Sequence, residues 1–128
     1  MPATEPEQIH RLFEEALNAR DIDALMALYE SDAALIPQPG MVAEGSAAIR
    51  ESLLWFIDRG GQVTLDTKLV VRVGDLAFLS NRWSLTGATM PDGSPAELGA
   101  TTAEVAHRQP DGTWLYVIDN AWGDQAAT

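Results

Sequence analysis

The first part of the chain repeats its apolar residues at helical spacing. A first helix is predicted, opened by a capping box of Thr4 and Glu7, and its apolar stripe consists of Ile9, Leu12, Phe13, Ala16 and Leu17. Asp21 can cap a second, short helix whose apolar residues are Leu25, Leu28 and Tyr29. Ser46 is the expected N-cap of a third helix, which ends at Gly60-Gly61 and has a core face of Ile49, Leu53, Phe56 and Ile57.

From Gln62 onward, the helical spacing gives way to the alternation that is typical of strands. Four long strands are predicted at residues 63–73, 76–86, 97–108 and 113–123, with turns at Gly74-Asp75 and Pro110-Asp111-Gly112 and a loop at 90–95. Because three helices come first and antiparallel strands follow, the order predicts an α+β fold with the helices packed on one face of a curved sheet. The length favours one domain over residues 1–128.

Charge and composition narrow the classes of partner. The net charge is −11 with only eight Lys and Arg residues, and a duplex-binding surface needs a basic stripe, so we expect no nucleic-acid partner. Residues 1–8 are acidic and polar, unlike a signal peptide, and no apolar run approaches membrane-spanning length. We therefore expect a cytoplasmic protein with no membrane partner. The absence of cysteine excludes disulfides and thiolate chemistry.

Successive side chains of a strand point to opposite faces of the sheet, so the predicted strands indicate which polar residues share a face. If Arg82, Glu104 and Asn120 point the same way, they meet on adjacent strands as a charge pair and an amide. This group is either an ordinary cross-strand ion pair near solvent or the polar floor of a cavity between the sheet and the helices. The opposite face would then be an apolar patch suited to a homodimer, made of Leu79, Trp83, Leu85, Val105, Leu115 and Val117.

Several short motifs, read in this layout, carry a resemblance that covers nearly the whole chain. The N-terminal half contains LNARDID at 17–23, Leu28-Tyr29, Asp32-Ala33, Gly45-Ser46 and Ala48-Ile49-Arg50, and the C-terminal half contains RQPDGTW at 108–114 and DNAWG at 119–123. With these motifs the chain resembles the nuclear transport factor 2-like superfamily, also called SnoaL-like or ketosteroid-isomerase-like. The resemblance implies a cone-shaped roll, a deep pocket that opens at one end, and often a homodimer through the outer sheet face.

Ketosteroid isomerase gives a mechanism that the resemblance can be tested against. There, an aspartate base moves a proton while a tyrosine and a protonated aspartate stabilise the oxyanion. The resemblance places Phe13 where that tyrosine stands and Pro37 or Ile36 where the base stands, and none of these can serve. Only Glu104 is a plausible counterpart, for the oxyanion acid. We therefore predict that the chain is not a steroid isomerase.

A different acid–base pair stays open. Glu104 in an apolar pocket could have a raised pKa and act as acid or base, although Arg82 beside it would hold it ionised. His10, on the outer side of the first helix, and His107, near a strand end, are expected at the surface, and two isolated histidines make no metal site. No glycine-rich phosphate loop is present, which argues against a nucleotide, and we expect no cofactor.

These observations favour a domain that binds a small hydrophobic or aromatic molecule. The expected pocket has apolar walls of Phe13, Tyr29, Trp55 and Trp122, although such aromatics are more often simply core, and a polar floor of Arg82, Asn120 and Glu104. Glu104 is the candidate catalytic residue. The first alternative is a cofactor-free isomerase, cyclase or dehydratase acting on a cyclic ketone or polyketide-like compound. The second is a structural or partner-binding domain with a filled core.

Overall fold

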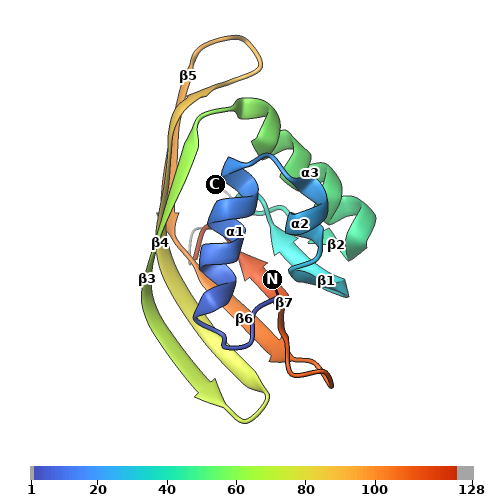
Figure 1. Cartoon of the computed structure of the whole chain (residues 1–128). Coiled ribbons are helices and arrows are strands. Elements are labelled where there is room, and N and C mark those ends of the chain that lie inside the picture. The colour runs from blue at the N-terminus through green and yellow to red at the C-terminus, as the bar shows by residue number, and fades with distance from the viewer. Residues whose placement is uncertain (1, 124–128) are drawn as a thin grey trace.

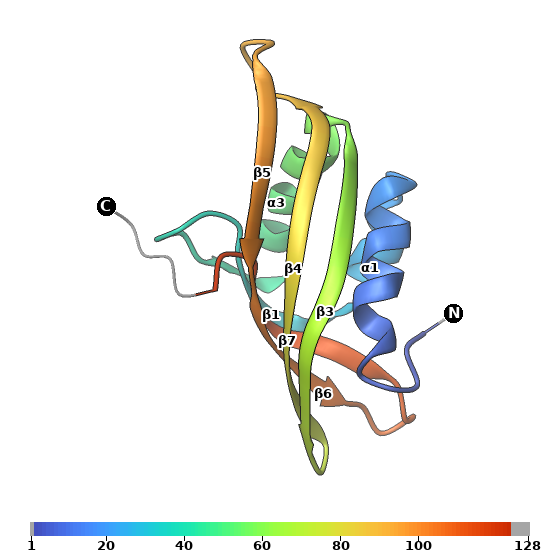
Figure 2. The ribbon, with the colours of Figure 1, turned by 90° about the vertical axis from the view of Figure 1, so that its left-hand side faces the viewer.

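The computed structural model describes residues 2–123 and has an α+β architecture (Figure 1). In chain order the elements are α1 (Gln8–Asn18), α2 (Ile22–Met26), β1 (Tyr29–Ile36), β2 (Ala43–Glu44), α3 (Gly45–Arg59), β3 (Gln62–Val73), β4 (Leu76–Thr89), β5 (Pro95–Thr101), β6 (Ala103–Arg108) and β7 (Trp114–Asn120). The three helices pack on the concave face of one curved sheet, as predicted. Figure 2 shows the other face of β3, β4 and β5 with the helices behind them.

The sheet is mixed and mostly antiparallel, and its strands follow the order β2-β1-β7-β6-β4-β3, with β5 also paired to β4. The pair β1–β7 is parallel, and the other pairs are antiparallel. The sequence predicted β3, β4 and β7, but the single strand predicted at 97–108 is divided at Thr102 into β5 and β6, and β1 was not predicted as a full strand. Tyr29 was expected on the second helix and instead begins β1, because α2 is a single short turn that ends at Met26.

Of the three predicted helix caps, one is confirmed and two are wrong. The Asp21 side chain accepts a hydrogen bond from the backbone N–H of Ala24 (3.0 Å), so its predicted cap of α2 is confirmed. The predicted capping box of Thr4 and Glu7 is wrong, because α1 begins at Gln8 and the Gln8 side chain itself accepts the Thr4 N–H (2.8 Å).

The predicted N-cap at Ser46 is also wrong. The third helix begins one residue earlier, at Gly45, with Glu44 in the cap position, and the Ser46 hydroxyl donates to the Ser31 carbonyl instead (3.4 Å). That contact ties the start of α3 to β1.

The apolar patch that was predicted for the outer sheet face is wrong in half of its residues. Leu79, Trp83 and Leu85 are at most 6% exposed and face the helices, because the concave face of β4 is the one that must bury apolar area. The outer face instead carries an apolar row in direct register across β3, β4, β6 and β7, made of Val71, Phe78, Val105 and Ile118. A homodimer through this face stays a prediction.

The junction between α3 and β3 depends on a close backbone approach. A Cβ built on Gly61 would lie 2.4 Å from the Thr86 carbonyl oxygen, and Gly61 has φ of +78°. Gly93 has φ of +86° but open space around its Cβ position. A side chain at Gly61 therefore meets a steric clash in addition to the unfavourable φ.

We expect Gly61→Ala to lower the free energy of unfolding by about 1–3 kcal/mol more than Gly93→Ala. Both variants carry the cost of a positive φ, so their difference isolates the contact with β4. Urea denaturation of the two variants and the wild type measures it. Equal losses would show that β4 moves away freely at this junction.

Candidate functional site

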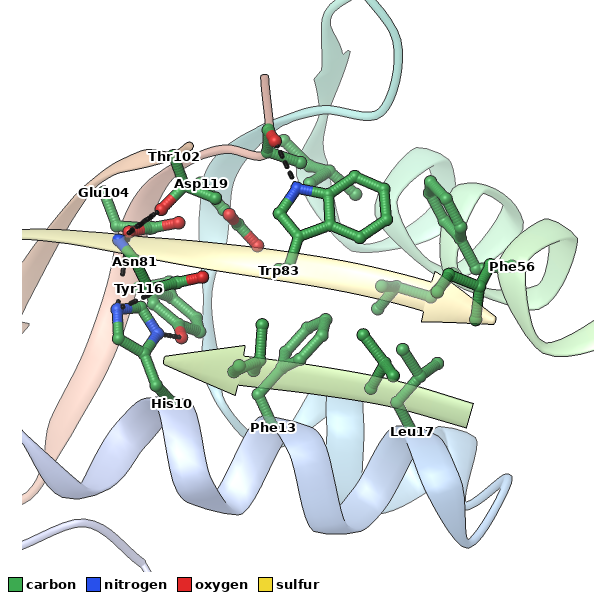
Figure 3. A pocket seen from close by; sticks show the side chains of 16 residues that line it. His10, Phe13, Leu17, Phe56, Asn81, Trp83, Thr102, Glu104, Tyr116 and Asp119 are labelled. Carbon is green, nitrogen blue, oxygen red and sulfur yellow. Dashed lines mark hydrogen bonds and ion pairs between the residues drawn. The ribbon is translucent and has the colours of Figure 1, made fainter. Parts of the chain in front are cut away.

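A cavity of about 60 Å³ lies between α1, α3 and the concave face of the sheet (Figure 3). This is well above the room that one water molecule needs. Most of its wall is apolar and includes Phe13, Leu53, Phe56, Leu65, Trp83 and Leu85. Polar side chains gather at one end of it, namely His10, Asn81, Thr102, Glu104, Tyr116 and Asp119. An apolar cavity with a few convergent polar groups is the usual form of a small-molecule site.

One face of α1 supplies a wall of the cavity. His10, Phe13 and Leu17 follow one another at spacings of three and four residues, so their side chains lie on the same side of the helix. His10 is only 2% exposed. The prediction that His10 lies on the outer side of the first helix is therefore wrong.

Two acidic side chains, Glu104 and Asp119, meet at the polar end. They lie opposite each other on the antiparallel strands β6 and β7. Asp119 faces the cavity because β7 has a bulge: Tyr116 pairs with Ala106 and Ile118 pairs with Val105, which leaves an extra residue between them. Beyond the bulge the alternation is shifted by one, so both Tyr116 and Asp119 point inward.

A hydrogen-bonded chain runs through the polar end (Figure 3). Asn81 Nδ2 lies 3.2 Å from His10 Nε2, and His10 Nδ1 lies 2.6 Å from the Tyr116 hydroxyl. The Thr102 hydroxyl donates to Glu104 Oε1 (2.8 Å). A proton on Glu104 therefore belongs on its other oxygen.

Burial governs the charge of both carboxyl groups. It raises the pKa of Glu104 to about 8, and the hydrogen bonds from Thr102 and with Asp119 oppose this rise. Burial, followed by the charge of Glu104, raises the pKa of Asp119 to about 7, while the Tyr29 hydroxyl opposes the rise by donating to Asp119 Oδ2 (2.5 Å). Near neutral pH this pair holds at least one proton, because two adjacent buried carboxylates repel each other.

The neighbouring groups are neutral. Burial lowers the pKa of His10 to about 4, so its contact with Glu104 (Nε2 to Oε1, 3.4 Å) is not an ion pair at neutral pH. Burial also raises the pKa of Tyr29 and Tyr116 well above the usual value, so both keep their hydroxyl protons. The carboxyl pair is therefore the part of the polar end that changes charge near pH 7, while His10, Tyr29 and Tyr116 stay neutral there.

The expectation that Arg82 lies beside Glu104 on the pocket floor is wrong. Arg82 alternates with Asn81 and Trp83, which line the cavity, so its side chain lies on the outer face and is exposed. Among residues 2–123, no arginine lines the cavity beside Glu104 to hold it ionised, and its pKa is raised. The structure places Glu104 and Phe13 in the cavity wall.

The other predicted residues lie around the cavity, not in its lining. Asn120 accepts the Trp122 N–H (3.1 Å) within the turn after β7, and the Trp122 indole donates to the Pro37 carbonyl (2.8 Å). Tyr29 stands behind Asp119 and Tyr116, since it donates to Asp119 Oδ2 and its ring packs against that of Tyr116 with centroids 5.2 Å apart. Trp55 borders a separate hollow between α3 and the segment 37–41. The role predicted for Asn120 is therefore wrong in placement, because the bulge turns it away from Glu104.

Sequence reasoning missed several polar residues of the site, although some left a signal. The spacing of His10, Phe13 and Leu17 places the histidine on an apolar helix face. Asn81 is the one polar residue among Leu79, Trp83 and Leu85 on its face of β4. The inward turn of Asp119 left no signal, because the bulge is not visible in the alternation.

Comparison with solved structures places the fold in the NTF2-like class. A ketosteroid isomerase-like protein from Erwinia carotovora atroseptica is 24% identical over 88% of each chain (TM-score 0.73). A proposed dehydratase of the NTF2-like family from Streptomyces avermitilis is 18% identical over 94% of each chain (0.71). A proposed calcium/calmodulin-dependent protein kinase type II association domain from Thiobacillus denitrificans is 22% identical over 98% of each chain (0.74). At these identities the likeness concerns the fold.

The family itself is shown by sequence. The profile of the SnoaL-like domain matches residues 9–117, so the chain belongs to this family. No protein in the curated set matches the chain significantly. Among residues 2–123, no helix is both long and apolar enough to cross a lipid bilayer.

The raised pKa of Glu104 predicts a pH-dependent cost in stability. Between about pH 4.5 and 8 the folded chain holds a proton on Glu104 that the unfolded chain has lost, so stability falls as the pH rises. We expect Glu104→Gln to gain stability relative to the wild type across this range, by on the order of a few kcal/mol. Thermal or urea unfolding from pH 5 to 9 measures the difference.

Glu97→Gln is the matched control, because Glu97 is exposed on β5. Its stability should follow that of the wild type at every pH. If the Glu104→Gln curve also runs parallel to the wild type, then burial does not raise the pKa of Glu104.

Proposed function

We propose that this protein is a cofactor-free acid–base enzyme that moves a proton on a small, mainly apolar carbonyl compound. The observation that carries the proposal is the pair of buried carboxyl groups, Glu104 and Asp119, at the polar end of an apolar cavity. Two carboxyl groups with pKa values of about 8 and 7 can supply one acid and one base near neutral pH.

Asp119 is the candidate base. The Tyr29 hydroxyl donates to its Oδ2 and stabilises its ionised form. Glu104 is the candidate acid, with its proton on the oxygen that Thr102 does not contact. The Tyr116 hydroxyl lines the same end and can donate to a carbonyl oxygen whose charge grows as the proton leaves.

The solved relatives support this reaction class and not a particular substrate. One is described as ketosteroid isomerase-like and another as a proposed dehydratase. Here the candidate base stands on β7 and pairs with Leu35 of β1, so it lies one strand over from Ile36 and Pro37, which the resemblance placed at the position of the isomerase base. A binding domain without turnover is the alternative, and the same apolar cavity would support it.

The first test follows proton transfer on a simple probe. In 3-cyclohexen-1-one, removal of a proton from C2 and its return at C4 moves the double bond into conjugation with the carbonyl. We expect the wild type to accelerate this conversion and to incorporate deuterium from D₂O. Asp119→Asn should lower the rate by roughly 100-fold or more, because it removes the base. Absorbance and mass spectrometry measure the two signals.

Glu97→Gln is again the control and should keep the wild-type rate, since Glu97 lies outside the cavity. A wild type that binds the probe without converting it would contradict the enzyme proposal and support the binding alternative. A wild type that neither binds nor converts small cyclic ketones would contradict both.

The pH dependence of the rate gives a second, independent test. The rate should rise as Asp119 ionises near pH 7 and fall as Glu104 loses its proton near pH 8, which gives a bell-shaped profile. The two limbs belong to the coupled pair. We expect Glu104→Gln to lower the maximum and to lose the alkaline limb. A profile that is flat from pH 6 to 9 would show that the pair does not carry the reaction.

A further inference from the structure

One polar atom at the polar end of the cavity has no hydrogen-bond partner within the described residues. Asn81 is 2% exposed, and its Oδ1 has no hydrogen-bond partner within residues 2–123. The rest of the residue is satisfied: its backbone N–H donates to the Thr102 hydroxyl (3.0 Å), and its Nδ2 contacts His10 Nε2 (3.2 Å). A buried acceptor without a donor is costly, so folded proteins seldom leave one unless something fills it.

The tautomer of the neutral His10 ring determines which hydrogen bonds Asn81 and Tyr116 can still make to a ligand. The amide nitrogen of Asn81 can only donate, so His10 Nε2 accepts, and the neutral ring carries its proton on Nδ1. That proton is donated to the Tyr116 oxygen, 2.6 Å away. The Tyr116 hydroxyl proton is then free to reach a ligand. The cavity therefore presents one free acceptor on Asn81 and one free donor on Tyr116.

The charge of the wall limits the ligand further. Within the described residues, no lysine or arginine side chain lines the cavity, and its histidine is neutral. An anionic ligand would be buried beside Glu104 and Asp119 without a counter-charge, at high cost. A cation would pair with the ionised Asp119 and so occupy the base that the proposed function requires. Only a neutral ligand fits these conditions.

We propose that the substrate is a neutral carbonyl compound that also carries a hydroxyl group, and that Asn81 Oδ1 selects it by accepting the hydrogen bond of that hydroxyl. The carbonyl oxygen then faces Tyr116, as the proposed function requires. This inference rests on the proposed function and adds a specificity-determining residue to it. Asn81, His10 and Tyr116 thereby act as one recognition unit, in which the ring holds the amide and the phenol at fixed orientations (Figure 3).

The test compares rings that differ by one group. Cyclohexanone, 3-hydroxycyclohexanone, 4-hydroxycyclohexanone and 4-oxocyclohexanecarboxylate are titrated into the wild type, with affinity measured by ligand-observed NMR. We expect at least one hydroxyketone to bind roughly tenfold more tightly than cyclohexanone, because it satisfies the buried acceptor. The carboxylate should bind more weakly than cyclohexanone.

Asn81→Leu removes the acceptor and keeps a similar volume, so it should bind cyclohexanone and the hydroxyketones about equally. Phe13→Leu is the matched control, because it alters the apolar wall and should weaken all the ketones together without changing their ratio. The melting temperature of each variant establishes that it is folded. The comparison of ligands on the wild type needs no variant, so the test survives if Asn81→Leu does not fold.

The outcomes separate this inference from the proposed function. Equal binding of cyclohexanone and both hydroxyketones by the wild type would overturn the role of Asn81 and leave the proton-transfer proposal standing. A hydroxyl preference without conversion of 3-cyclohexen-1-one would support Asn81 as the selecting residue and count against turnover. Preferred binding of the carboxylate would overturn the neutral-substrate inference.

Discussion

The chemistry of this pocket depends on one irregularity of the backbone, the β-bulge in β7. An uninterrupted strand would turn Asp119 to the same face as Leu115 and away from Tyr116. The extra residue between Tyr116 and Ile118 shifts the alternation, so the acid and the phenol both face the cavity. Glu104, opposite Asp119 on β6, then becomes half of a pair. Without the bulge the cavity would hold a single carboxyl group and no adjacent base.

The pair can be buried because the surrounding groups satisfy it without adding charge. Tyr29 and Thr102 each donate a hydrogen bond to one carboxyl group, and His10 stays neutral. The raised pKa values express the remaining desolvation cost, since a proton on the pair removes charge from an apolar interior. The same feature that costs stability as the pH rises above about 4.5 thus keeps an acid and a base in one site. Such a conflict between stability and function is expected where polar groups are buried for chemistry.

Indole groups fix the rim of the cavity on the side of β7. The Trp83 N–H donates to the Ala121 carbonyl (2.6 Å), and the Trp122 N–H donates to the Pro37 carbonyl (2.8 Å). The two rings pack edge to face, with centroids 5.3 Å apart. They join the turn after β7 to β4 and to the end of β1. Trp122, predicted as a pocket wall, therefore supports the wall from behind by holding Trp83.

The sequence by itself determined the three helices and the long strands that follow them, because the change from helical spacing to alternation is a local signal that each segment carries. It also determined that Glu104 lies in a strand and that the residues around it favour an apolar pocket. Only the tertiary structure decided which face of β4 is buried, and so moved Arg82 outward and Asn81 inward. It also decided that His10 and Asp119 join the site. The physical reason is that alternation fixes which residues share a face within one strand, whereas the packing of helices and a one-residue bulge decide which face meets the core.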